Sequence, residues 1–302
     1  MKKISILIIS VAAVLLSFSS CKPKDEIYDP VCKISKIWYY SNSDWDHPNL
    51  VFKYGEKNML DSIIVDSAQT FVFAYNKDKT VSQITNVQED YTEVIDITYE
   101  DCLVNKILYK VNDTVRQEVN FTRDEETQRI THIEEIYDRL FYESFQYAKS
   151  LRLYNTFMGD FADIQSRIQF SPVKDMEVRC TKEVKYAPGK KEKYEDIESI
   201  TETYPYLNEV IVRTFTYDEE DVTYNPFYGL PYAYSSFSGY HVHNYATQTE
   251  QVLLYGTENK RTVYTYDYRG ENYLNKKKYP RQFTTTSSEN NIPRNTYILY
   301  AK

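Results

Sequence analysis

The sequence predicts an all-β protein: a long antiparallel meander of hairpins that forms a strongly curved sheet or an open barrel, with at most one or two short helices. Three observations lead to this fold class. The 302 residues are 42% apolar, which is enough for a large core and excludes disorder. Aromatic residues recur at a regular interval. Clusters of Asp, Glu, Asn and Lys follow them and supply turns, because these polar residues favour turns over strands.

The repeat is anchored by an aromatic residue at the end of each alternating segment. In residues 51–63 and 72–84, the anchor is a Tyr, and an apolar pair follows it six and nine residues later. Successive anchors lie 21 to 26 residues apart, which accommodates two strands and two turns. Alternation places Phe52 and Tyr54 on one face of the sheet, and we expect tyrosines to line its interior. The anchors are Tyr54, Tyr75, Tyr99, Phe121, Tyr147 and Phe170.

Residues 129–148 are open to two interpretations. Their apolar residues also fit the stripe of a helix, and helix-forming residues such as Glu134 and Glu135 support that reading. Enrichment in β-branched and aromatic residues favours strands instead, and the repeat continues in residues 144–147 and 167–170. We favour strands here, with at most one helix.

The second half of the chain returns to the same pattern. Alternating segments occupy residues 212–217 and 261–267, and residues 297–300 predict a closing strand. A sheet of so many strands must curl, split or close, because its twist accumulates and its bare edges invite aggregation. We expect residues 225–245 to cover one end of it, and residues 31–302 to form a single domain.

The N-terminus resembles the signal peptide of a bacterial lipoprotein. Lys2 and Lys3 form a basic start, residues 4–18 form an apolar stretch, and two serines precede Cys21. Such a stretch is too short to cross a bilayer comfortably. In lipoproteins with this pattern the Cys is lipidated after cleavage, so residues 1–20 would be removed and Cys21 would carry the lipid. Ordinary secretion with an unmodified Cys21 is the alternative.

The residues after Cys21 bear on where the protein is displayed. Lys22-Pro23-Lys24-Asp25-Glu26 resembles the surface-export signal of Bacteroidetes lipoproteins, although any solvated linker has a similar composition. We expect residues 21–30 to form a tether. The protein would then be an outer membrane lipoprotein, exposed at the cell surface and held to the membrane by its lipid. The net charge of −8 argues against nucleic acid as a partner.

Three features together resemble one family. They are the repeated aromatic-x-Tyr-Asp hairpins, the segment Asn225-Pro226-Phe227-Tyr228-Gly229-Leu230, and a final Tyr-Thr-Tyr-Asp hairpin at 264–267. These resemble an uncharacterised family of Bacteroidetes lipoproteins, a domain of unknown function. The match covers about residues 50–280 and is strongest at 212–280. The resemblance implies an antiparallel sheet of successive hairpins and a host of that group, and it implies no established activity.

The densest aromatic cluster is the candidate binding site. Between residues 224 and 245, eight of 22 residues are aromatic. An exposed Tyr offers a flat apolar face and a hydroxyl, which suit the C–H faces and hydroxyls of sugars. We therefore predict that an extracellular glycan binds to Tyr228, Tyr232, Tyr234 and Tyr240. Glycan binding is a hypothesis beside the reading that we favour, in which this segment is a plug that packs into one end of the sheet. The two are compatible, because Tyr hydroxyls can stay in water while the rings pack.

Signatures of enzymes and metal sites are missing from the sequence. It has no Gly-rich phosphate loop, no Gly-x-Ser-x-Gly elbow and no His-Glu-x-x-His, so we expect no enzyme activity and no cofactor. His241 and His243 could share a metal on one strand face, and residues 218–221 could hold calcium, but both lack further ligands or the right spacing. No metal site is predicted. Three further cysteines are interpreted as buried small side chains, with one disulfide possible: Cys32, Cys102 and Cys180.

The sequence therefore favours a lipid-anchored envelope protein with a non-enzymatic binding role. A structural or assembly component of an envelope or fimbrial complex is the alternative, which would work through protein contacts. A carrier that holds a lipid inside the curled sheet is a third class, and it requires an apolar interior cavity. The sequence does not identify which protein partners the chain has.

Overall fold

The structure is a computed structural model of the whole chain. It describes residues 30–39, 46–55, 58–101, 103–144, 151–169, 177–187, 196–217, 223–228, 241, 243–268 and 278–301.

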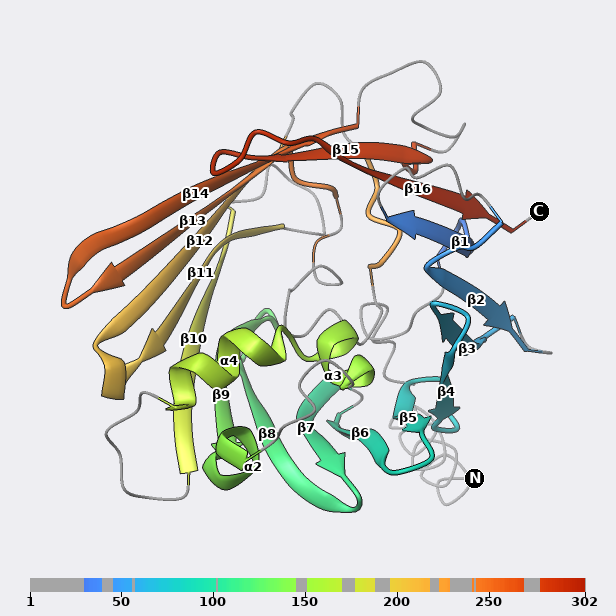
Figure 1. Cartoon of the computed structure of the whole chain (residues 1–302), viewed down its shortest axis with the longest axis horizontal. Coiled ribbons are helices and arrows are strands. Elements are labelled where there is room, and N and C mark those ends of the chain that lie inside the picture. The colour runs from blue at the N-terminus through green and yellow to red at the C-terminus, as the bar shows by residue number, and fades with distance from the viewer. Residues whose placement is uncertain are drawn as a thin grey trace, which may run out of the picture.

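Sixteen antiparallel strands form a closed barrel in which each strand pairs with its neighbours in sequence, and β1 pairs with β16 to complete the ring (Figure 1). The all-β meander is confirmed, and the sheet closes rather than staying open. The strands are β1 (Ile34–Tyr39), β2 (Leu50–Tyr54), β3 (Leu60–Val65), β4 (Gln69–Tyr75), β5 (Val81–Val87), β6 (Thr92–Glu100), β7 (Leu103–Val111), β8 (Thr114–Arg123), β9 (Ile130–Asp138), β10 (Glu177–Tyr186), β11 (Ile197–Tyr204), β12 (Glu209–Thr216), β13 (Thr247–Leu254), β14 (Thr257–Asp267), β15 (Gln282–Ser287) and β16 (Arg294–Tyr300).

Among the described residues, three short α-helices lie within the ring of strands, between β9 and β10 in sequence (Figure 1). They are α2 (Arg139–Ser144), α3 (Arg152–Phe157) and α4 (Phe161–Gln169), and a 3-10 turn, η1, spans Pro205–Leu207. Residues 130–138 form a strand and a single helix follows, as favoured for that region. The expected strand repeat at 167–170 is wrong, because Arg167–Gln169 belong to α4. The total also exceeds the one or two helices expected. No helix of the described segments is long and apolar enough to cross a membrane.

The two faces of the barrel wall differ because successive strand residues point to opposite sides. In β10, Val178, Cys180 and Val184 are buried, while Arg179 and Glu183 between them are exposed. Ion pairs join neighbouring strands across the outer face. They are Lys110–Asp96 at 2.6 Å, Lys106–Glu118 at 2.9 Å, Arg116–Asp138 at 2.6 Å and Arg179–Glu134 at 2.6 Å. The wall is therefore charged outside and largely apolar inside.

The helices fill part of the interior with aromatic rings. The Phe157 ring of α3 packs edge-on against Phe71 of β4 at 5.5 Å, and Tyr154 packs against Tyr109 of β7 at 4.9 Å. Glu93 points inward from β6 and accepts hydrogen bonds from the backbone N–H groups of Leu153 (3.2 Å) and Tyr154 (3.0 Å). A carboxylate of the sheet thus satisfies the first turn of α3, whose own N-cap provides no side-chain bond.

The sequence repeat corresponds to a repeated bond between hairpins. Tyr54, Tyr75 and Tyr99 each follow a β-bulge at the end of β2, β4 and β6. The Tyr75 hydroxyl donates to the Leu60 carbonyl at 2.5 Å, and the Tyr99 hydroxyl donates to the Val81 carbonyl at 2.9 Å. Each acceptor is the residue paired with the anchor of the preceding hairpin. We call these bonds the anchor ladder.

The anchor ladder continues beyond the tyrosines recognised in the sequence. Arg123 takes the equivalent position in β8 and donates to the Val104 carbonyl at 3.3 Å. Later in the chain, Tyr217 donates to the carbonyl of Ile197 at 2.8 Å, and Tyr300 donates to that of Pro280 at 2.6 Å. Phe121, an anchor predicted from the sequence, is instead a buried core residue. It lies two positions before Arg123 in β8. The anchors Tyr147 and Phe170 lie outside the described residues.

Candidate functional site

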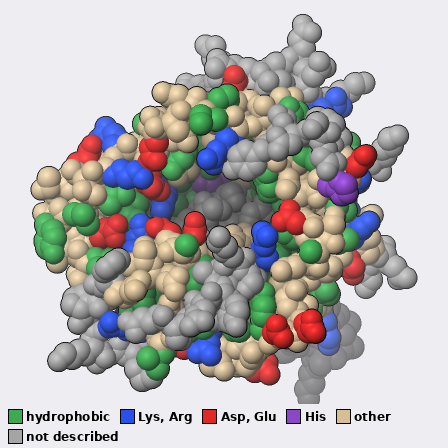
Figure 2. Space-filling view, viewed as in Figure 1, with side chains coloured by type: hydrophobic (Ala, Val, Ile, Leu, Met, Phe, Trp, Pro, Cys, Tyr) green, Lys and Arg blue, Asp and Glu red, His purple; other side chains and the backbone are tan. Residues whose placement is uncertain are grey.

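A cavity of roughly 350 Å³ lies inside the barrel between the α3–α4 turn and the inner face of β9 to β14. Figure 2 shows that the face of the molecule seen in this view is hollowed at its centre, with acidic and basic side chains around the hollow. The cavity is lined by Glu135, Tyr137, Met158, Gly159, Asp160, Asp163, Ile164, Lys182, Ile200, Glu202, Arg213, Tyr245, Gln248 and Tyr266.

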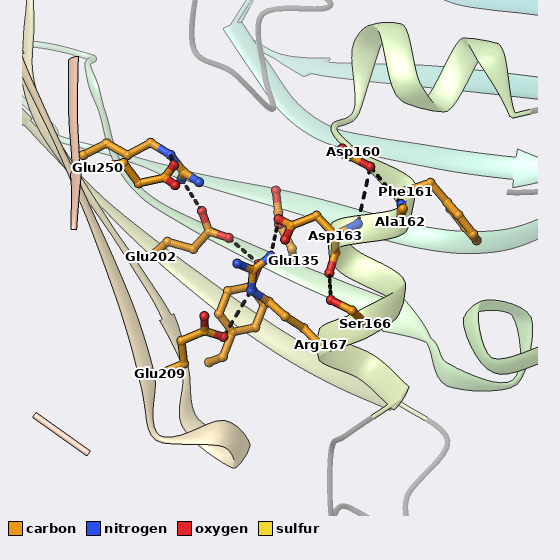
Figure 3. Close-up of polar contacts among 12 residues, drawn as sticks. Glu135, Asp160, Phe161, Ala162, Asp163, Ser166, Arg167, Glu202, Glu209 and Glu250 are labelled. Atoms are coloured by element: carbon orange, nitrogen blue, oxygen red, sulfur yellow. Dashed lines mark hydrogen bonds and ion pairs between the residues drawn. The ribbon is translucent and has the colours of Figure 1, made fainter. Parts of the chain in front are cut away.

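A line of alternating charges crosses five neighbouring strands at this cavity, and we call it the charge line: Glu135 on β9, Lys182 on β10, Glu202 on β11, Arg213 on β12 and Glu250 on β13. Register brings these side chains together, since Lys182 is directly opposite Glu202 and Arg213 is directly opposite Glu250. The Lys182 ammonium lies 2.8 Å from Glu135 and 3.9 Å from Glu202. Arg213 then bridges Glu202 at 2.6 Å and Glu250 at 2.9 Å (Figure 3).

Mutual attraction keeps these buried groups charged. Burial acts against the charge on Lys182, but Glu135 and Glu202 outweigh it and raise the pKa of Lys182 above its usual value. Burial likewise acts to raise the pKa of Glu202, yet Lys182 and Arg213 hold that pKa well below its usual range. Lys182 and Glu202 are therefore both ionised at neutral pH.

Two tyrosines complete the charge line. The Tyr137 hydroxyl donates to Glu135, and the Tyr204 hydroxyl donates to Glu202; each pair sits two residues apart on one strand, and so on one face. Burial raises the pKa of both tyrosines well above 10, so both hydroxyls remain protonated donors. The carboxylates are thus held by hydroxyls as well as by cations.

Arg167 fixes α4 against this wall. Its guanidinium pairs with Asp163 one turn earlier on the helix, and its Nε lies 3.1 Å from Glu209 of β12 (Figure 3). It also stands over the Tyr204 ring, 5.2 Å from the ring centre. Because Asp163 lines the cavity, Arg167 positions one wall of the cavity relative to the sheet.

Aromatic rings also line the cavity, beside the charge line. Tyr245 and Tyr266 pack edge-on with ring centres 4.9 Å apart, and both line the cavity with Gln248. The Tyr266 hydroxyl donates to the side-chain amide oxygen Oε1 of Gln248 at 3.4 Å. The cavity therefore offers flat apolar faces together with charged and polar donors and acceptors. This combination suits a neutral molecule rich in hydroxyls.

The tyrosines predicted to bind a glycan do not line this cavity, or they lie outside the described residues. Tyr228 is half-buried in the turn after Asn225 and does not line the cavity. Tyr232, Tyr234 and Tyr240 lie outside the described residues, as does Cys21. Tyr245, the last aromatic residue of the same cluster, does line the cavity and was not singled out from the sequence.

The described ends of the aromatic segment pack into the fold. Phe227 packs against the core, and the buried Asn225 donates its side-chain amide to the His241 carbonyl at 2.8 Å. His241 and His243 make separate contacts: the His241 ring approaches the Tyr217 hydroxyl at 2.5 Å, and His243 pairs with Asp196 at 2.8 Å.

Within the described segments no three His, Cys, Asp or Glu side chains are grouped to hold a metal, and residues 218–221 lie outside them. Cys180 is buried, as predicted. Cys32 is half-buried, because it precedes β1 at the edge of the fold, and the prediction of full burial is wrong for it. Cys102 lies outside the described residues.

Comparison with known proteins gives a likeness in fold. No protein-family model and no curated protein matches the chain. A porin-like protein from Bacteroides vulgatus superposes with a TM-score of 0.50 and 11% identity, over 89% of this chain and 99% of that one. The two proteins share a barrel fold.

Two weaker matches accompany it. A porin-like protein from Bacteroides uniformis has a TM-score of 0.37 at 11% identity, over 89% of this chain and 98% of that one. TcdB2-TccC3 without its hypervariable C-terminal region has a TM-score of 0.37 at 11% identity. The superposition covers 84% of this chain and 12% of that one.

Proposed function

We propose that this chain is a non-enzymatic, lipid-anchored protein of the bacterial cell envelope that binds a short glycan inside its barrel. The cavity carries the proposal, because the rings of Tyr245 and Tyr266 line it together with charged side chains such as Lys182, Glu202 and Arg213. Sugar rings stack on aromatic faces through their C–H groups, while their hydroxyls bond to carboxylates, guanidinium groups and amides. The proposed glycan site is therefore in the barrel interior, and not at Tyr228 and its neighbours as the sequence suggested.

A binding role fits the cavity better than catalysis does. A glycosidase needs one carboxyl group that donates a proton, which requires a raised pKa. Glu202 has a lowered pKa, held there by Lys182 and Arg213, and so it remains an acceptor at neutral pH. Ion pairs that already satisfy the carboxylates favour recognition over proton transfer.

The envelope location rests on the N-terminus and on the outer face of the barrel. A barrel that sits in lipid turns an apolar band outward. Here the outer face carries ion pairs such as Lys110–Asp96 and Arg116–Asp138, and these favour a barrel that stands in water. Lipid at Cys21 would then hold it to the membrane through the tether of residues 21–30. The fold likeness to a porin-like Bacteroides protein is consistent with an envelope setting.

A melting screen of the full chain with Cys21→Ser against a panel of oligosaccharides tests glycan binding. A ligand of the native state raises the melting temperature by mass action, by an amount that grows with its concentration. We expect Gln248→Leu to abolish the rise, because Gln248 lines the cavity. Gln251→Leu is the matched control, because Gln251 lies on the same strand, β13, but on its exposed face. There its side chain donates a hydrogen bond to Glu258 of β14. An unchanged rise in Gln248→Leu would place the glycan elsewhere.

A further inference from the structure

A second cavity of roughly 420 Å³ lies inside the barrel beside α3, on the inner face of β2 and β3. It shares no lining residue with the cavity at the charge line. Its lining residues are Tyr39, Asn49, Leu50, Phe52, Ile63, Val65, Asp66, Arg152, Asn155 and Thr156.

The floor of this second cavity is apolar. Leu50 and Phe52 point inward from β2, and Ile63 and Val65 point inward from β3; all four are buried. Strand alternation alone places them on one face. Because no charged side chain lines this floor, it can accept a hydrocarbon chain without leaving a buried charge unpaired.

The mouth of the second cavity carries one cation with spare donors. Arg152, at the start of α3, pairs with Asp66 through Nη1 at 3.3 Å. Both side chains are about half exposed, at 48% and 42%. Among the described residues no partner is found for Nε or Nη2 of Arg152, so most of its planar fork remains available. Asp66 is also held by the Asn49 amide at 3.1 Å, which leaves Arg152 the more adaptable member of the pair.

We propose that this second cavity binds a free medium-chain fatty acid, with its tail over Phe52 and Ile63 and its carboxylate on Arg152. A guanidinium group binds a carboxylate through two parallel N–H bonds, and such charge-assisted bonds are the stronger kind. Each buried methylene of the tail adds to binding by leaving water. The cavity, at roughly 420 Å³, falls in the size range of small-ligand sites, so we take decanoate as the probe.

Titration calorimetry with decanoate, below its micellar concentration, tests the proposal on the full chain with Cys21→Ser. We expect saturable binding of one decanoate per chain. Arg152→Gln should weaken it about tenfold or more, because the charge-assisted bond is lost. Decanol should bind more weakly than decanoate, and equally well to both forms. Arg116→Gln is the matched control, since Arg116 pairs with Asp138 on the outer face.

Thr156→Trp blocks the cavity from its rim. Thr156 is half-buried on α3, so the larger ring narrows the cavity without entering the apolar floor. We expect it to abolish binding of both decanoate and decanol while the circular dichroism and the melting temperature persist. Absence of saturable decanoate binding overturns the proposal, and so does binding that neither Arg152→Gln nor Thr156→Trp alters. Gln248→Leu should leave decanoate binding intact, which separates this result from that of the glycan site.

Discussion

The Tyr99 hydroxyl donates a hydrogen bond to the Val81 carbonyl at 2.9 Å, and this bond joins two successive hairpins of the barrel. Val81 is the residue that pairs with Tyr75, the anchor of the preceding hairpin, and Tyr75 in turn bonds to Leu60. The tyrosine that recurs in the sequence is therefore a structural residue. Its ring packs against the core while its hydroxyl satisfies a carbonyl at a bulge, where the regular ladder of backbone bonds is interrupted.

Removal of one bond of the anchor ladder should cost modest stability. We expect Tyr99→Phe to lower the free energy of unfolding by about 1 kcal/mol, because the Val81 carbonyl loses its donor while the ring is retained. Urea unfolding measures the change. Tyr255→Phe is the control, since Tyr255 is 80% exposed at the tip between β13 and β14. Equal effects of the two substitutions would mean that the bond at Val81 contributes nothing.

The charge line should be far more sensitive than the outer face. Lys182→Met leaves Glu135 buried with no cation beside it, and we expect a loss of about 3–5 kcal/mol in the free energy of unfolding. Lys106→Met removes the lysine of the ion pair with Glu118 on the outer face, where both side chains are about one third exposed. It should lower the free energy of unfolding by less than about 1 kcal/mol.

A double substitution separates charge from packing in the charge line. Lys182→Met combined with Glu135→Gln removes both charges of the pair, and it should recover part of the loss. Chemical denaturation of all variants under one buffer gives the comparison. If the double variant is no more stable than Lys182→Met alone, the cost comes from packing of the lysine stem and not from an unpaired carboxylate.

Local pattern was sufficient to predict the hairpins, because alternation and turn residues act over a few positions. The strands around Tyr54, Tyr75 and Tyr99 fall where their anchors placed them. Residues 297–300 were expected to form a closing strand, but its partner was not predictable, since β1 and β16 lie at opposite ends of the chain and only tertiary structure pairs them. Residues 167–169 mimicked a strand because Ile168 alternates with polar neighbours, yet they complete the buried stripe of α4.

The candidate site was missed for a related reason. Glu202 and Arg213 occupy inward positions of β11 and β12 that alternation assigns to the core, and a charge at such a position is the signal that was available. The partners of these charges come from other strands, so sequence spacing alone does not reveal that Lys182 lies beside Glu135. Aromatic density did lead to the neighbourhood, since Tyr245 ends the cluster singled out from the sequence.

Acidification should destabilise the fold through His241. Burial lowers the pKa of His241 to about 4, from an ordinary value of 6.5 in the unfolded chain. Between these values the unfolded chain binds the proton and the folded chain does not. The contribution of His241 is therefore complete above pH 6.5 and is lost as the pH falls toward 4, with a slope of up to about 1.4 kcal/mol per pH unit.

His241→Phe tests this pH dependence, because it keeps a ring beside Phe215 and Tyr245 and removes the titrating group. Denaturant unfolding at a series of pH values should give a flatter profile between pH 4 and 6.5 than the parent chain gives. His132→Gln, on the outer side of β9, controls for the loss of a histidine. If the free energy of unfolding depends on pH equally in the parent chain and in His241→Phe, groups other than His241 dominate between pH 4 and 6.5.

Attachment to the membrane should depend on Cys21 alone. The outer face of β6 to β10 carries the ion pairs Lys110–Asp96 and Arg179–Glu134, and a charged side chain on a lipid-facing strand costs about 2–4 kcal/mol near the bilayer centre. We therefore expect the parent chain to sediment with outer membranes, and Cys21→Ser to be released by an alkaline wash that leaves embedded barrels in place. Retention of Cys21→Ser after the wash, with mass spectrometry showing that residues 1–20 have been removed, would mean that the strands themselves enter the bilayer.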